Sequence, residues 1–247
     1  MIHYHGGPIT PEPLARRAWQ RGHAFVSFRH PRQIEVAATF AQSFALDNGA
    51  FSIWRATGAV PDSWDDYYWW AGEWLAHPAC DWAVIPDVID GTEAENDELV
   101  DAWPHGHRGV PVWHLNESID RLARLAADGW PRIALGSTQQ YDVSSPAKCL
   151  PRLAEAVGAI STADGMPLVK LHGLRMLNPA ITERVPLSSA DSTNLAMNTK
   201  HDQAWRGSYS PASKETRIDV LRERIELAIT PARMAPIDQQ ASLWEAS

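Results

Sequence analysis

The sequence predicts an α/β protein built as a single (β/α)8 barrel of the TIM type, in which eight parallel strands alternate with helices. Eight short apolar segments alternate with amphipathic ones along the chain, a pattern typical of parallel strands joined by helical crossovers. Polar residues directly follow these apolar segments, as they do at the catalytic face of a barrel. The length of 247 residues suits one barrel of about 250 residues. An open doubly wound sheet is the alternative.

The strands are expected where short apolar runs end at a polar residue, Gly or Pro. They are Met1–His5, Ala24–Phe28, Phe44–Leu46, Trp82–Ile85, Val110–Trp113, Arg132–Leu135, Leu168–Leu171 and Leu187–Ala190. The helices are expected at Pro11–Arg21, Pro31–Gln42, Ser63–Ala76, Glu93–Trp103, Ile119–Ala127, Pro146–Ile160, Pro179–Arg184 and Ser213–Ala228. Thr92 and Glu95 have the spacing of a capping box, and Ser118 is placed to cap the helix after it. The barrel is therefore expected to span residues 1–230, with residues 231–247 as a peripheral or flexible tail.

Composition excludes several classes of protein. No run approaches the roughly 18 apolar residues of a membrane span, and the N-terminus lacks a signal-peptide pattern, so a cytoplasmic protein without membrane contact is expected. Cys80 and Cys149 form no CxxC pair, and there is no glycine-rich phosphate loop. Neither a cysteine zinc site nor a cofactor is therefore expected. The net charge of −8 argues against wide nucleic-acid contact, although residues 56–107 contain no Lys or Arg and the remainder is mildly basic.

The strand ends carry polar and titratable residues of the types that act in catalysis and ligand binding. In chain order they are His5, Arg29, Asp47, Asp87, His114, Ser137, His172 and Asp191. Any one of them has an ordinary structural explanation, since an aspartate after a strand often caps the next helix. As a set they predict a site at the C-terminal face of the barrel.

One hypothesis for this site is a metal-dependent hydrolase. Its ligands would be His3, His5, His114, His172 and Asp191, because histidine and carboxylate are suitable zinc ligands. Their order is similar to that of metal-dependent amidohydrolases. That family has histidines on the fifth and sixth strands, whereas here they follow the fifth and seventh.

The other hypothesis is carboxylate chemistry at a glycosidic carbon. One aspartate would attack the sugar C1′ and the other would handle the proton of the base, as in retaining glycosyl transfer. Asp47 and Asp191 are expected to face one pocket in these roles, with Phe51 as a stacking surface. A base-binding module without catalytic activity is a third possibility.

Six segments in order resemble motifs of the tRNA-guanine transglycosylase family, and most closely the phage and bacterial enzymes that insert 7-deazaguanines into DNA. They are LDNGAF, IPDVID, WHLNES, ALGST, KLHGL and SADSTN, which lie between about residues 40 and 195. The resemblance implies a pentosyltransferase that exchanges guanine for a free 7-deazaguanine base in nucleic acid. The family's cysteine-rich zinc site and the insert that carries it are absent, which slightly favours DNA over tRNA. The oligomeric state is not indicated.

The resemblance also implies a role for each matched residue. Asp191 corresponds to the nucleophile, Asp47 to the general acid and base, and Phe51 to the aromatic ring that stacks on the base. Asp87 would read the edge of guanine. The other implied substrate-binding residues are Asn48, Gly49, His114 in place of a Gln, Gly136, Ser137, His172 in place of a Met, and Gly173. The polar segment 198–211, which follows Asp191, is expected to act as a substrate lid.

Overall fold

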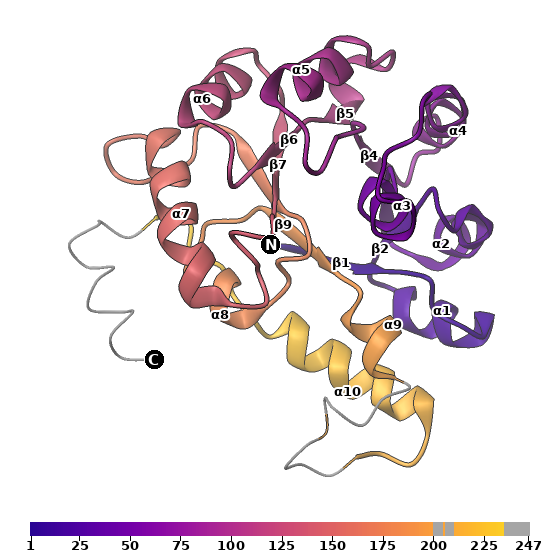
Figure 1. Ribbon diagram of the computed structural model, residues 1–247. Coiled ribbons are helices and arrows are strands. Elements are labelled where there is room, and N and C mark those ends of the chain that lie inside the picture. The colour runs from indigo at the N-terminus through magenta and orange to yellow at the C-terminus, as the bar shows by residue number, and fades with distance from the viewer. Residues whose placement is uncertain (200–204, 206–209, 235–247) are drawn as a thin grey trace.

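The computed structural model describes residues 1–199, 205 and 210–234. Its centre is a sheet of nine parallel strands that forms a nearly closed barrel surrounded by helices, which confirms the predicted fold class (Figure 1). The strands are β1 (Ile2–Gly6), β2 (His23–Ser27), β3 (Ser43–Asp47), β4 (Cys80–Val84), β5 (Gly109–Val110), β6 (Val112–His114), β7 (Arg132–Gly136), β8 (Lys170–Gly173) and β9 (Ser189–Ser192). Their order in the sheet is β5-β4-β3-β2-β1-β9-β8-β7-β6.

The helices lie outside the strands and follow them in the expected alternation. They are α1 (Glu12–Trp19), α2 (Ile34–Phe40), α3 (Ala50–Thr57), α4 (Asp65–Leu75), α5 (Glu93–Asp101), α6 (Ile119–Ala127), α7 (Pro146–Ala159), α8 (Pro179–Thr182), α9 (Asn194–Asn198) and α10 (Lys214–Glu226), with short 3-10 turns at Pro31–Gln33 and Gly106–Arg108. The capping box of Thr92 with Glu95 and the cap at Ser118 are both confirmed. Helix α3 was not predicted. It is bracketed by Gly49 and Gly58, whose φ angles of 78° and 76° are ones that glycine adopts without steric cost.

The count of nine strands corrects the expected eight, and Pro111 is the reason. The single strand expected at Val110–Trp113 is divided into β5 and β6, with Pro111 between them. Proline has no backbone N–H and cannot donate to a sheet ladder. Backbone bonds from Ile85 to Val110 (3.0 Å) and from Ala134 to Pro111 (2.9 Å) hold the two sides together at this point.

Two apolar clusters account for the core. The smaller one fills the barrel and includes Tyr4, Phe25 and Trp82, whose rings pack at centroid distances of 5.5–6.2 Å. The larger one lies between the strands and the helices. Because successive residues of a strand point to opposite faces, Tyr4 inside the barrel places its neighbours His3 and His5 on the outer face. The interior of the barrel is therefore a packed core.

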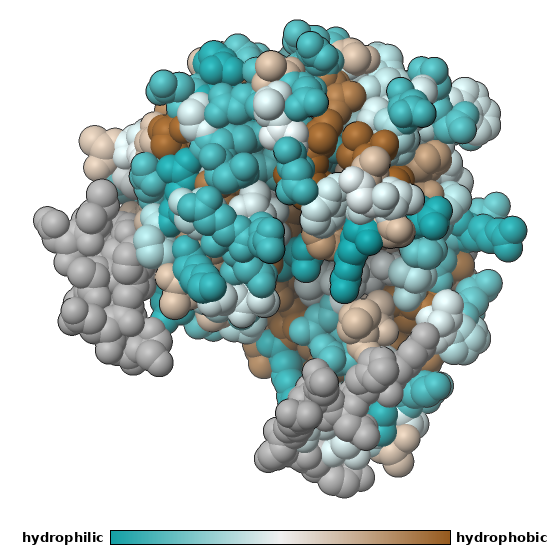
Figure 2. All heavy atoms as spheres, viewed as in Figure 1, coloured by the Kyte–Doolittle hydropathy of each residue, from teal (hydrophilic) through white to brown (hydrophobic). Residues whose placement is uncertain are grey.

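The C-terminal helix closes the ring where the first and last strands meet. Strand β1 pairs with β9, and α10 packs on α1 through the ion pair between Arg17 and Asp219 (2.5 Å). Beyond α10, the buried Met234 donates its backbone N–H to Gly165 (2.9 Å), so the expected tail begins as an attached segment; residues 235–247 lie outside the described part of the chain. Hydrophilic residues cover most of the face seen in Figure 2. None of the described helices is long and apolar enough to cross a membrane.

Candidate functional site

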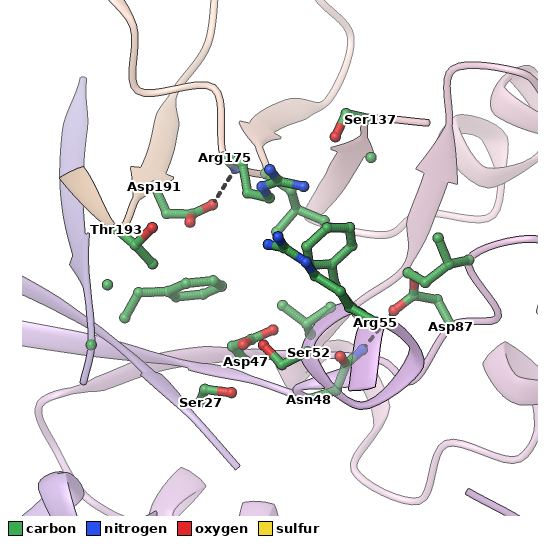
Figure 3. Close-up of a pocket in the computed structure, with 18 of the residues that line it drawn as sticks. Ser27, Asp47, Asn48, Ser52, Arg55, Asp87, Ser137, Arg175, Asp191 and Thr193 are labelled. Atoms are coloured by element: carbon green, nitrogen blue, oxygen red, sulfur yellow. Dashed lines mark hydrogen bonds between the residues drawn. The ribbon is translucent and has the colours of Figure 1, made fainter. Parts of the chain in front are cut away.

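A cavity of about 360 Å³ lies at the C-terminal ends of the strands. Eight of the predicted site residues line it: Asp47, Asn48, Phe51, Asp87, His114, Gly136, Ser137 and Asp191. Figure 3 shows the aspartates of β3, of the segment after β4 and of β9 around one open space. The volume of the cavity falls in the usual range for small-molecule sites. The topology therefore brings together residues that are up to 144 positions apart in the sequence, from 47 to 191.

Asp47 is the last residue of β3 and faces the cavity. Its other sides are surrounded by protein. Burial raises the pKa of Asp47 to about 6, and the negative charges of Asp191 and Asp87 act in the same direction. The Ser27 hydroxyl and the Gly49 backbone oppose this shift. A carboxyl group with this pKa exchanges its proton close to neutral pH, as a general acid and base must.

Asp191, in β9, is almost fully buried and held through one of its two oxygens. Its Oδ1 accepts a hydrogen bond from the backbone N–H of Arg175 (2.8 Å) and lies 3.3 Å from Nε2 of His172. Arg175 has a φ of 60°, an uncommon conformation for a residue with a side chain. Among the described residues, none donates a hydrogen bond to Oδ2. The carboxylate is thus fixed at one oxygen, while the other remains available to a ligand.

His172 lies beneath Asp191 inside the barrel and does not line the cavity, contrary to the role that the resemblance implied. Its Nδ1 is 2.9 Å from the hydroxyl of Ser189, and that hydroxyl accepts a hydrogen bond from Arg132 (2.6 Å). Because Arg132 can only donate, the Ser189 proton is directed to Nδ1, and His172 carries its own proton on Nε2. The 3.3 Å approach of Nε2 to Asp191 does not have hydrogen-bond geometry. Burial lowers the pKa of His172, so the ring is neutral.

Asp87 and His114 form a pair in which the histidine is charged, unlike His172 beside Asp191. Nε2 of His114 is 2.9 Å from Oδ2 of Asp87, and Nδ1 is 3.3 Å from Oε1 of Glu117. Burial opposes a charge on His114, but the two carboxylates outweigh it and raise the pKa of His114 to about 9. Both ring nitrogens are thus engaged, so His114 acts on a ligand through Asp87. Glu117 in turn accepts a hydrogen bond from the buried Arg121 (2.6 Å).

Asn48 and Gly136 shape the cavity around these acids. The Asn48 amide donates to Oδ1 of Asp87 (2.8 Å), and its oxygen accepts from the N–H of Ala50 at the start of α3. Gly49 is the N-cap residue of α3 and does not line the cavity. A Cβ on Gly136 would lie 2.8 Å from the His114 ring, so glycine is required for His114 to reach Asp87. Gly173 instead packs against Met176 and is not among the lining residues.

The predicted stacking surface is covered. The guanidinium of Arg175 lies over the Phe51 ring at 4.2 Å from its centroid, and Arg55 also lines the cavity. Sequence reasoning missed both arginines, for which no motif gave a signal. It also missed Glu117, although a carboxylate three residues after His114 was a usable signal.

The alternative metal site is not assembled. His3 is 3.3 Å from the carbonyl of Ala228, and His5 is 3.0 Å from the carboxylate of Glu226, so both face the C-terminal helix rather than Asp191. Within the described part of the chain, no group of three or more His, Cys, Asp or Glu side chains is arranged to hold a metal ion. Most of the expected lid, residues 200–204 and 206–209, lies outside the described residues.

No model of a known protein family matches the chain, and no curated protein matches it significantly.

Proposed function

We propose that the protein is a transglycosylase that exchanges guanine for a 7-deazaguanine base in nucleic acid, with DNA favoured over tRNA. The observation that carries the proposal is the pair of aspartates, Asp47 and Asp191, that faces one cavity of ligand size at the C-terminal end of a barrel. The motif resemblance assigned these same two residues to catalysis. The raised pKa of Asp47 suits it to move a proton.

Asp87 supports guanine as the base that is bound. Oδ2 of Asp87 lies 2.9 Å from Nε2 of the charged His114, and Oδ1 accepts a hydrogen bond from the Asn48 amide. A carboxylate has about four lone-pair positions, so two remain for a ligand. Guanine presents two adjacent donors, N1–H and the 2-amino group, whereas adenine presents an acceptor at N1. A 7-deazaguanine keeps the same edge, so one site serves the departing and the incoming base.

The proposed reaction has two displacements at C1′. The Asp191 carboxylate bonds to C1′ while the C1′–N9 bond breaks, and the departing guanine takes a proton on N9 from Asp47. The incoming base then gives its N9 proton to Asp47 and bonds to C1′, which releases Asp191. The nucleophile is regenerated and the proton returns to Asp47. Negative carboxylates around the sugar stabilise the positive charge that develops in both transition states.

Replacement of Asp191 tests this proposal. Asp191→Asn keeps the oxygen that accepts from the Arg175 N–H, so the fold is expected to persist. Because the amide cannot act as the nucleophile, incorporation of labelled guanine into a guanine-containing DNA oligonucleotide, or into tRNA, should fall by at least about 10³-fold. A covalent protein–nucleic acid adduct should form with the wild-type protein alone.

Asp219→Asn is the matched control, because Asp219 is an exposed aspartate that pairs with Arg17 outside the cavity. It should exchange guanine at the wild-type rate. Undiminished exchange by Asp191→Asn, or an adduct that forms in that variant, would exclude Asp191 as the nucleophile.

A further inference from the structure

The cavity is lined by two arginines that the proposed exchange reaction does not use. Its inner wall carries the aspartates 47, 87 and 191 with His114 beside Asp87, whereas Arg55 and Arg175 also line it. Figure 3 shows both arginine side chains extending over the open space between these aspartates. Arg55 follows Phe51 by four residues in α3, so the two lie on the same face of that helix. Arg175 covers the Phe51 ring from the loop after β8.

Neither guanidinium has an acidic partner that would account for its position. In the part of the chain that the structure describes, no carboxylate forms an ion pair with Arg55 or Arg175. Hydrogen bonds from Ser144 lower the pKa of Asp142, and the charge of Arg175 contributes further, but Asp142 remains bonded to Ser144. Two guanidinium groups that line one cavity repel each other, and an anion between them would relieve that repulsion.

The position of Arg175 also conflicts with a stacked base. A base on Phe51 would lie about 3.5–4 Å from the ring, and the guanidinium carbon is already at 4.2 Å. The base and this guanidinium therefore cannot occupy the same face together. The Arg175 backbone is fixed by its bond to Asp191 (2.8 Å), whereas its side chain is exposed and long enough to move.

We propose that Arg55 and Arg175 bind a phosphate group of the substrate nucleotide at the cavity mouth, and that Arg175 leaves the Phe51 ring as it does so. The planar guanidinium fork matches the geometry of phosphate oxygens. The phosphate thereby uncovers the ring on which the base then stacks. This inference rests on the proposed function in that the bound group is taken to be a nucleotide.

A pair of trinucleotides tests the proposal directly. Each has a central guanine, and they differ only in whether the linkages beside it are normal phosphodiesters or neutral methylphosphonates. For the wild-type protein, calorimetric titration should show that neutral linkages weaken binding by about tenfold, since hydrogen bonds to charged groups contribute about 1.5–3 kcal/mol. In Arg55→Gln, in Arg175→Gln and in the double variant, this ratio should fall below about threefold. Equal binding of both trinucleotides by the wild-type protein, or no binding of either, would overturn the proposal.

Arg16→Gln is the matched control. Arg16 is an exposed arginine that lies over Phe40 at 4.3 Å, so its loss removes a similar cation–π contact away from the cavity. This variant should keep the wild-type ratio, and a loss as large as in the Arg175 variant would show that the effect is not specific to the cavity. Inorganic phosphate distinguishes the source of the anion. It should compete only weakly, and competition as strong as that of the trinucleotide would make free phosphate the ligand.

Guanine exchange is measured separately on the same proteins. If the phosphate-dependent ratio behaves as expected but no exchange occurs, the reaction is wrong and the phosphate site stands. If exchange occurs and the ratio is the same in every variant, the phosphate site is wrong and the reaction stands.

Discussion

Two buried histidines, His114 on β6 and His172 on β8, each lie within 3.3 Å of an aspartate that lines the cavity, yet His114 is charged and His172 is neutral. His114 lies between two carboxylates, and its pKa is raised to about 9. His172 has one carboxylate beside it, and burial lowers its pKa despite that neighbour. The charge of Arg132 on the far side of Ser189 acts in the same direction as burial.

The difference shows that contact with one carboxylate does not fix the charge of a buried histidine. The second carboxylate, Glu117, overcomes the cost of burial on β6, whereas on β8 the corresponding position is taken by the hydroxyl of Ser189. The consequence differs for the two aspartates. Asp87 lies beside a charged histidine, whereas Asp191 lies beside a neutral one.

The largest expected effect follows from removing the second carboxylate. Glu117→Gln takes away the charge that pairs with both His114 and the buried Arg121. Breaking a buried ion pair of this kind should lower the free energy of unfolding by about 3–5 kcal/mol, measured by urea denaturation.

Glu155→Gln provides the comparison, because Glu155 is exposed and pairs with Arg152 at 2.7 Å. Its loss should cost less than about 1 kcal/mol. Similar losses in the two variants would mean that Glu117 does not hold the charges on this side of the cavity.

The pH dependence of stability should have opposite signs for the two histidines. The folded pKa of His114 is raised to about 9 from 6.5, so its contribution is complete below pH 6.5 and is lost as the pH rises through 9. This shift corresponds to about 3 kcal/mol. The folded pKa of His172 is lowered, so its contribution is present above pH 6.5 and is lost as the pH falls.

Urea denaturation at pH 5, 7 and 9.5 separates the two contributions. His114→Gln should reduce the loss of stability on the alkaline side, and His172→Gln should reduce the loss on the acid side. If His114→Gln instead flattens the acid side, the assignment of charge is reversed.

The smallest expected effect concerns the hydroxyl beside His172. Ser189→Ala removes the group that donates to Nδ1, so protonation of that nitrogen becomes easier and the pKa of His172 should rise, as followed by NMR titration of the ring. The cost in stability should be about 1 kcal/mol.

Ser188→Ala removes a hydroxyl that accepts from the same Arg132 (2.7 Å) but is not bonded to His172. It should leave the His172 titration unchanged. Equal shifts in the two variants would show that Arg132, rather than the Ser189 hydroxyl, sets the state of the ring.

The sequence was sufficient for the parts of the fold that depend on local pattern. Apolar runs that end at Asp47, His114 and Asp191 correctly indicated strand ends. Both parts of this signal, the buried apolar run and the polar residue that follows it, are adjacent in the sequence. Thr92 and Ser118 indicated helix starts for the same reason. Pro111 is evident in the sequence, but its effect on the strand count depends on how the segments on its two sides, β5 and β6, pair with other strands.

The contacts across the cavity were not predictable in this way. The bond of His114 to Asp87 and the cover of Phe51 by Arg175 depend on side-chain directions that the chain order does not specify. One error was avoidable. His3 and His5 alternate with Tyr4, so a strand that buries Tyr4 inside the barrel must turn both histidines outward.

The position of Asp191 on one side of the cavity, as the nucleophile of the proposed exchange, has a stereochemical consequence. In the proposed exchange, Oδ2 bonds to C1′ on the side opposite the departing base, and the incoming base then displaces it from the original side. Two inversions at one carbon restore its configuration. The modified nucleotide therefore keeps the β-anomeric glycosidic bond and remains able to stack and pair within a duplex.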